Sequence, residues 1–364
     1  MEKENQTKNE KYKIAVYAIA KNEEKFVDRW VESIKDADEI IVLDTGSSDE
    51  TVNKLKQKNV KVYEKKIEPW RFDVARNESL NLVSKDIDIC ICLDLDEVIE
   101  NGWYEKLQKI WNNNITRLLY IYNWHFDKDN NPDVTFYSEK IHSRKGYKWI
   151  NPVHEILESE KEKKVITDEI VINHYPDETK SRSSYLPLLE LAVKESPTDD
   201  RNVHYLGREY MYYGKWNEAI DTLINHLNLK TATWKDERSA SMRFISRCYK
   251  NLKRYDEARL WLDKAIEETP YLRDPFIERA LLEYTLDNWK DVEYYCLKAL
   301  NITKREKSYI NEIFSWDYTV YDLLSLSYYH QNEKFLALKY VDKAIEMKKE
   351  DVRLEQNRKI FEKM

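Results

Sequence analysis

The chain has 364 residues, 42% of them apolar, 35% charged and 13% aromatic, and this length predicts two or three folded domains. The formal net charge of −7 argues against a nucleic-acid-binding protein, and only five glycines occur, none of them in a glycine-rich phosphate loop. The apolar run at 14–20 is too short to span a membrane. We therefore expect a folded cytoplasmic protein, with its four cysteines as core thiols rather than disulfides.

Short β-rich runs alternate with helical stretches in the first half of the chain. The alternation predicts a mostly parallel α/β sheet with helices on its faces. Four later runs look like strands without intervening helices, so the sheet is expected to continue in mixed or antiparallel fashion. The predicted strands are 13–20, 39–44, 61–64 and 87–95, then 118–124, 133–143, 148–157 and 164–174, and the predicted helices are 24–35, 49–58 and 73–84.

The second half shows a weak helical repeat, found by setting Ala219, Ala258, Val292 and Ala337 in register. A glycine, serine or alanine lies twelve residues before each of them. The middle spacing is 34 residues, the period of tetratricopeptide repeats, and the longer outer spacings predict longer turns. We predict an α/β domain over 1–180 and four helical repeats over 181–364. An irregular helical domain without repeats is the alternative.

Two aspartates, Asp94 and Asp96, end the apolar strand that contains Cys90 and Cys92. Residues two apart on a strand point the same way, and at the carboxyl end of a parallel strand they face the ligand crevice. Two carboxylates there suit Mg²⁺ or Mn²⁺, which can neutralise a diphosphate. A solvated turn is the alternative interpretation of this pattern.

Polar residues also follow the first two predicted strands. Ala20, Asn22 and Glu23 come at the end of the first, and Asp44 ends the second. Further along, Arg76 lies close to the start of a predicted helix, where a phosphate could be held. A surface helix with ordinary basic residues would explain the arginine equally well.

Four segments, in this order, resemble family two of the inverting glycosyltransferases: Ala-Lys-Asn-Glu-Glu, Asp-Thr-Gly-Ser-Ser-Asp-Glu-Thr, Trp-Arg-Phe-Asp-x-Ala-Arg-Asn and Asp-Leu-Asp-Glu. The resemblance covers about residues 12–180 and implies a GT-A fold, a nucleotide-binding α/β domain. It is closest to the branch fused to tetratricopeptide repeats, which includes lipopolysaccharide-core glucosyltransferases and peptide S-glycosyltransferases.

The resemblance also implies roles for the strand-end residues. It places Asp44 at the nucleoside, Asp94 near the ribose or the metal, and Asp96 as the direct metal ligand. We assign Ala20, Asn22, Glu23 and Arg76 to the same nucleotide-sugar site.

Two histidines lie near predicted strand ends, in Asn-Pro-Val-His154-Glu155 and in Ile-Asn-His174. Lone histidines are more often structural. The resemblance places the first segment at the acceptor side and lets a histidine complete the metal site. We therefore predict Glu155 as general base, His154 as a residue that orients or replaces it, and His174 as second metal ligand. Glu97 is an alternative base.

The chain also departs from part of the family. Family-two polysaccharide synthases carry Gln-x-x-Arg-Trp and membrane helices, and neither is found in this sequence, which disfavours a processive synthase. Lys180 and Arg182 could clamp the leaving diphosphate, or could belong to a plain charged linker.

The predicted function is inverting, metal-dependent transfer of one sugar, a UDP-hexose by family default, to a peptide or protein acceptor. A lipopolysaccharide or cell-surface glycan acceptor is the alternative within this class. A repeat-based interaction scaffold with an inactive first domain is the alternative of another class. A sugar-nucleotidyltransferase is disfavoured because no glycine-rich loop follows the first strand. A homodimer through the helical domain stays open.

Overall fold

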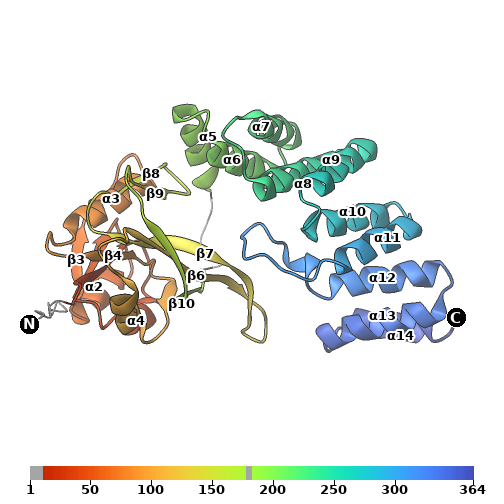
Figure 1. Cartoon of the computed structure of the whole chain (residues 1–364), viewed down its shortest axis with the longest axis horizontal. Helices are drawn as coiled ribbons and strands as arrows, with labels where there is room; N and C mark the ends of the chain where they lie inside the picture. The colour runs from red at the N-terminus through yellow and green to blue at the C-terminus, as the bar shows by residue number, and fades with distance from the viewer. Residues whose placement is uncertain (1–10, 178–182) are drawn as a thin grey trace, which may run out of the picture. The chain divides into compact units, whose positions relative to one another are not determined.

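The computed structural model describes residues 11–177 and 183–364, and the chain divides into two compact units, Met1–Arg182 and Ser183–Met364 (Figure 1). The predicted boundary between residues 180 and 181, like the predicted clamp of Lys180 and Arg182, lies outside the described residues. Among the described residues, no helix is long and apolar enough to cross a membrane. Each unit is described by itself below.

The first unit is built on an eight-stranded mixed sheet in the order β3-β2-β1-β4-β7-β6-β10-β5 (Figure 1). Strands β1 to β4 are parallel, β7 is antiparallel to both β4 and β6, β10 is parallel to β6, and β5 is antiparallel to β10. The predicted α/β sheet with a mixed continuation is therefore confirmed. The strands are β1 (Ile14–Ala20), β2 (Glu39–Asp44), β3 (Lys61–Glu64), β4 (Ile89–Cys92), β5 (Glu97–Ile99), β6 (Arg117–Phe126), β7 (Pro132–Ser143) and β10 (Lys164–His174).

Helices cover both faces of this sheet because its central strands are apolar on both sides. On one face, Val16 of β1 shares a buried cluster with Trp30 and Trp103. On the other, Tyr17 shares a cluster with Leu80. The alternation of neighbouring residues along β1 thus fixes which helix packs on which face. The helices are α1 (Val27–Ser33), α2 (Thr51–Gln57), α3 (Phe72–Leu82) and α4 (Trp103–Ile110).

Two parts of the strand prediction are wrong. The run 148–157 is not one strand but a pair, β8 (Lys148–Ile150) and β9 (Ile156–Glu158), which form their own antiparallel sheet. The chain reverses between them with Asn151 and His154 in the left-handed region, at φ values of 78° and 50°. Strand β5 and helix α4 lie where no separate strand and no helix were predicted.

The second unit is helical (Figure 1). Four helical hairpins, α6/α7, α8/α9, α10/α11 and α12/α13, each have a three-residue turn, and α5 and α14 flank them. The helices are α5 (Tyr185–Glu195), α6 (Asp200–Tyr212), α7 (Trp216–Asn228), α8 (Lys235–Asn251), α9 (Tyr255–Glu268), α10 (Asp274–Thr285), α11 (Trp289–Leu300), α12 (Thr319–His330), α13 (Lys334–Met347) and α14 (Val352–Phe361), with a short 3₁₀ turn at Ile313–Ser315.

The four hairpins confirm the predicted repeat register. The register residues Ala219, Ala258, Val292 and Ala337 are fully buried, one in the second helix of each hairpin. Twelve residues earlier the first helices approach closely: a Cβ on Gly207 would lie 2.5 Å from the Leu223 Cγ atom. Each turn also has its second residue in the left-handed region, at φ values between 57° and 69°. These turn residues are Gly214, Lys253, Asp287 and Asn332.

The long connection between α11 and α12, residues 301–318, returns to helices earlier in the unit. Arg243 of α8 donates through Nη2 to the Ile310 carbonyl oxygen at 3.1 Å. The backbone N–H of Glu312 donates to the Asp274 carboxylate at the start of α10 at 2.6 Å. This connection is the longer turn that the 45-residue spacing from Val292 to Ala337 predicts.

Candidate active site

The predicted donor-site residues lie at the carboxyl ends of neighbouring parallel strands. Ala20 ends β1 and Asp44 ends β2, while Asp94 follows the end of β4, the other neighbour of β1. Because these strands are parallel and adjacent, their carboxyl ends meet at one edge of the sheet. Open α/β sheets bind ligands at this edge.

The loops after β1 and β2 are tied together by side chains. The buried Asp44 carboxylate accepts hydrogen bonds from the backbone N–H groups of Gly46 at 3.0 Å and Ser47 at 2.9 Å. The backbone N–H of Asn22 donates to the Ser47 hydroxyl at 2.8 Å, and the Ser48 N–H donates to the Asn22 side-chain oxygen at 2.7 Å. Asp44 therefore shapes the turn that follows β2.

Ala20 and Glu23 belong to the same pair of loops. The Ala20 carbonyl oxygen accepts a hydrogen bond from the Thr45 N–H at 2.9 Å. The backbone N–H of Glu23 donates to the Thr51 hydroxyl at 2.7 Å, at the start of α2. The structure thus brings Ala20, Glu23 and the two residues above into one polar junction.

A buried arginine joins two of the predicted carboxylates. The Arg76 guanidinium on α3 pairs with Asp94 through both terminal nitrogens, and its Nε donates to Glu155 Oε1 at 3.0 Å. Lys140 Nζ lies 3.0 Å from the same Asp94 carboxylate. Burial by itself would raise the pKa of Asp94, but the two cations outweigh it and hold that pKa well below its usual range. Asp94 is therefore a fixed negative charge.

Glu97 is the third carboxylate of this network and is also buried. Its Oε1 accepts from the Tyr122 hydroxyl and from Lys140 Nζ, both at 2.6 Å, and its Oε2 accepts from the Asp94 N–H at 2.8 Å. Burial raises the pKa of Glu97, and Asp94 and Asp96 act in the same direction, against Lys140. Both oxygens are occupied, so this geometry favours Glu97 as a support for Asp94 rather than as a base.

Lys140 and Tyr122, which donate to Asp94 and Glu97, were not predicted from the sequence. In the sequence, Lys140 lies an even number of residues after Val134 and Phe136, which is the spacing of residues that share a strand face, while in the structure the pairing of β7 with β6 shifts between Ser138 and Ile141. A lysine at an even spacing from apolar residues of the same strand is the sequence pattern that could have identified Lys140 as an inward-facing cation. Tyr122 carries no comparable signal within its apolar strand.

The two predicted metal ligands lie close together. His174, the last residue of β10, pairs with Glu97 of β5, and its Nε2 is 3.5 Å from Asp96 Oδ2. The His174 Nδ1 lies 3.1 Å from the Trp124 carbonyl oxygen, to which it can only donate. In a neutral His174 the Nε2 lone pair then faces the Asp96 carboxylate, and in a protonated His174 the two residues form an ion pair. Burial lowers the pKa of His174, but the contact with Asp96 outweighs burial and raises that pKa above its usual value. One imidazole nitrogen at the end of β10 and one carboxylate oxygen in the turn between β4 and β5 fit a Mn²⁺ or Mg²⁺ ion whose other ligands would come from a diphosphate.

The loop that carries His154 and Glu155 is held against α3. The Phe72 N–H donates to the Pro152 carbonyl oxygen at 3.0 Å. The Asn77 amide both donates to and accepts from the backbone of Trp149, at 2.8 Å and 2.9 Å. The segment 70–77 therefore positions the loop that carries His154 and Glu155. In this structure the Arg76 guanidinium holds carboxylates, and its predicted role at the donor stays a prediction.

The predicted residues thus form separate groups within residues 11–177. No hydrogen bond or ion pair in that range joins Asp96 or His174 to Arg76 or Glu155. Glu97 connects the groups, because its backbone pairs with His174 and its carboxylate holds Asp94. Asp96 and His174 thus form a candidate metal position beside the negative charge of Asp94. The Glu155 carboxylate lies on the other side of the Arg76 guanidinium, which pairs with both Asp94 and Glu155.

Residues 15–169 match the model of the family described as glycosyl transferase family 2. The first unit is a family 2 glycosyltransferase domain, and a helical repeat region follows it in the chain.

Solved structures with a similar chain path include repeat proteins. MamA is 17% identical, with 49% of this chain and 99% of that chain covered and a TM-score of 0.38. A tetratricopeptide repeat protein of Thermus thermophilus is 19% identical, with 50% and 91% covered and a TM-score of 0.35. The repeat architecture itself rests on the four hairpins described above. A search of curated proteins found no match.

Proposed function

We propose that this protein is an inverting, metal-dependent glycosyltransferase that moves a single sugar from a nucleotide-sugar, UDP-hexose as the first candidate, to a peptide or protein acceptor. The observation that carries the proposal is the Asp96–His174 pair, whose Oδ2 and Nε2 atoms lie 3.5 Å apart at the ligand-binding edge of a family 2 domain. A bound Mn²⁺ or Mg²⁺ would supply the positive charge that stabilises a departing diphosphate.

The remaining residues divide the work of binding and proton transfer. Asp44, with Ala20, Asn22 and Glu23 beside it, receives the nucleoside, and Asp94 lies between the nucleoside and the metal position. The family match and the shared strand edge support this division.

Glu155 acts as the general base. The acceptor oxygen or sulfur forms a bond to the anomeric carbon as the bond from that carbon to the diphosphate breaks. The acceptor proton passes to Glu155. Because Arg76 Nε holds Oε1, we place the proton transfer at Oε2. Inversion follows from this single displacement.

The helical repeats dock the acceptor. Tyr212, Tyr213 and Trp234 are exposed by 58%, 49% and 42%, whereas Tyr210 and Tyr249 pack against the helical core. Exposed aromatic rings offer rigid contact area for a peptide or a sugar. A scaffold that only binds partners would use the same surface, so activity has to separate the two functions.

A donor screen tests the enzymatic proposal without knowledge of the acceptor. Full-length protein is incubated with UDP-, GDP- and dTDP-sugars, and hydrolysis is measured with Mn²⁺, with Mg²⁺ and with chelator. We expect hydrolysis of one donor class that depends on the metal, and UDP should raise the melting temperature only when metal is present. If no nucleoside diphosphate or donor shifts the melting temperature with either metal, the scaffold function is favoured.

Acceptor docking is tested with exposed tyrosines on two hairpins. Tyr213→Ser should raise the KM for a peptide acceptor and leave donor hydrolysis unchanged. The control is Tyr294→Ser. Tyr294 lies on α11, and the residue is 53% exposed. Equal KM values for wild type and both variants would contradict docking at the first hairpin, and transfer to a glycan but to no peptide would favour the glycan acceptor.

A further inference from the structure

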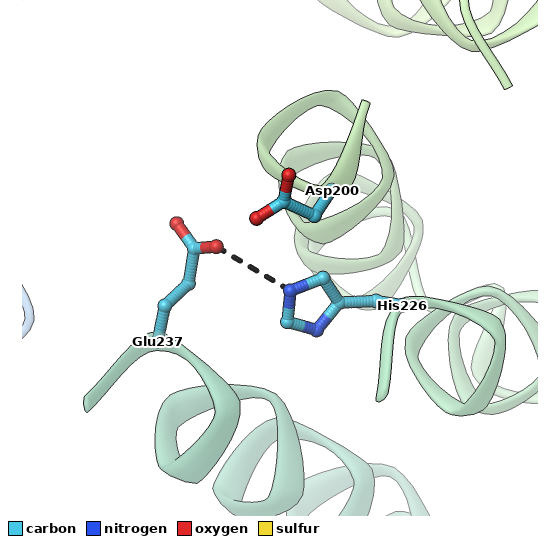
Figure 2. A group of neighbouring side chains, drawn as sticks. All are labelled: Asp200, His226 and Glu237. Carbon is cyan, nitrogen blue, oxygen red and sulfur yellow. Dashed lines mark ion pairs between the residues drawn. The ribbon is translucent and has the colours of Figure 1, made fainter. Parts of the chain in front are cut away.

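Three ligand-type side chains converge in the helical unit, outside the candidate active site. Asp200 begins α6, His226 lies in the last turn of α7, and Glu237 lies in the first turn of α8 (Figure 2). One ligand atom from each lies within 4.8 Å of the other two. His226 and Glu237 are buried and Asp200 is half-buried.

His226 is oriented by hydrogen bonding on one side only. Its Nδ1 lies 2.9 Å from the Ser241 hydroxyl oxygen, which is 2.8 Å from the Nδ1 of the buried His204. A hydroxyl has one proton, so when Ser241 donates to His204 it accepts from His226 Nδ1. In that arrangement the proton of a neutral His226 is on Nδ1 and its Nε2 carries the lone pair, whereas in the reverse arrangement the proton is on Nε2 and faces Glu237.

The Nε2 atom of His226 points into the cluster (Figure 2). It is buried and makes no hydrogen bond, although it lies 3.3 Å from Glu237 Oε1. A buried nitrogen without a hydrogen bond is uncommon and requires an explanation. A proton on Nε2 would give an ion pair with Glu237, and a metal ion would be bound by both residues.

The second carboxylate oxygen of Glu237 also has a hydrogen-bond partner. Its Oε2 accepts a hydrogen bond from the Tyr309 hydroxyl at 3.1 Å. Metal-binding histidines and carboxylates characteristically have such outer partners, here Ser241 and Tyr309, which fix the direction of the ligand atoms. The two carboxylates also balance the charge of one divalent cation, which relieves the repulsion between them.

We propose that Asp200, His226 and Glu237 bind a divalent transition-metal ion, with Zn²⁺ as the best match. One imidazole nitrogen and two carboxylate oxygens are common zinc ligands, and the half-buried side of Asp200 leaves a fourth position for water. The ion joins the first hairpin, which contributes α6 and α7, to α8 of the second hairpin. Its role is to lock this hairpin interface.

The test strips full-length protein with chelator, reloads it with Zn²⁺, and measures the Zn²⁺ that stays bound after dialysis. It is carried out on Asp96→Asn, so that the candidate active site does not contribute bound metal. We expect this protein to retain stoichiometric Zn²⁺ and to melt at higher temperature with it. Adding Glu237→Gln should abolish both effects, whereas adding Glu218→Gln, an exposed residue of α7, should leave both unchanged.

Two further variants keep the test decisive if Glu237→Gln fails to fold. Asp200→Asn alters the half-buried ligand, and Ser241→Ala should weaken Zn²⁺ binding by roughly 10–100-fold through loss of the outer hydrogen bond. A Co²⁺-loaded protein should show the intense visible absorption of a four-coordinate site. The proposal is overturned if Asp96→Asn retains no Zn²⁺, or if these substitutions leave the bound amount and affinity unchanged.

Discussion

Replacing Arg76 with methionine is the most direct perturbation of the candidate active site. Methionine fills much of the same space but removes the guanidinium that joins Asp94 to Glu155. Glu155, whose side chain is 12% exposed, then loses this cation. Asp94 keeps only Lys140, at 3.0 Å. Uncompensated negative charge therefore stays at the junction of α3, β4 and the loop 151–155.

The expected cost follows from the burial of the groups. Breaking a buried ion pair by removing one partner costs about 3–5 kcal/mol. The lower end applies because the Asp94 side chain retains 27% exposure and a second cation. A loss of about 3 kcal/mol corresponds to roughly a 10²-fold change in the opening equilibrium of the first unit.

Hydrogen exchange of the β4 amides measures this equilibrium in the full chain, without assuming that the two units unfold together. The control is Lys65→Met, which breaks the exposed pair with Glu78 on α3 and should cost no more than about 1 kcal/mol. Arg76→Lys should recover only part of the loss, because lysine lacks the planar fork. If Arg76→Met lowers β4 protection no more than Lys65→Met, the network does not hold this edge of the sheet.

Three further predictions concern the first unit. Asp96→Asn should abolish metal-dependent donor hydrolysis with an unchanged circular dichroism spectrum, and recovery of activity at saturating Mn²⁺ would contradict the metal assignment. Glu155→Gln should lower turnover by ~10²–10⁴ with little change in donor KM, as expected for loss of a general base; an equal loss of donor affinity would place Glu155 at the donor instead. Burial lowers the pKa of His142 to about 3 from 6.5, so the unfolded state binds a proton that the folded state does not, and stability falls as pH decreases below 6.5. Between pH 6.5 and pH 5 this amounts to about 2 kcal/mol in urea unfolding, and His142→Gln should remove that part of the pH dependence.

The sheet was predictable where each strand carries its own signal. The predicted bounds of β2, β3 and β10 equal the observed ones, because apolar runs there end at turn or charged residues. The hairpin at 148–157 was not recognised because its reversal uses Asn151 and His154 in left-handed conformations, with no glycine to mark it. Helix α4 was not predicted, because the predicted strands on either side of it, 87–95 and 118–124, were interpreted as successive strands of the sheet.

The sequence predicted that the site residues lie at strand ends, but it did not predict the hydrogen bonds and ion pairs that join them. The motif order places Asp94 and Asp96 at one strand end, and the closeness of His174 to Asp96 follows from the pairing of β5 with β10. The link from Arg76 to Glu155 spans 79 residues and depends on the reversal between β8 and β9. Local sequence patterns contain no record of such a contact.

The connection 301–318 changes how the helical unit should unfold. In a simple repeat array each hairpin contacts only its neighbours, so stability is a sum of nearest-neighbour terms and the array can fray from either end. Here a segment between the third and fourth hairpins bonds to Arg243 of the second and to Asp274 of the third. Loss of the last hairpin would expose this segment and weaken an interface two hairpins away. The array therefore gains long-range cooperativity from the one stretch of the unit that departs most from the repeat.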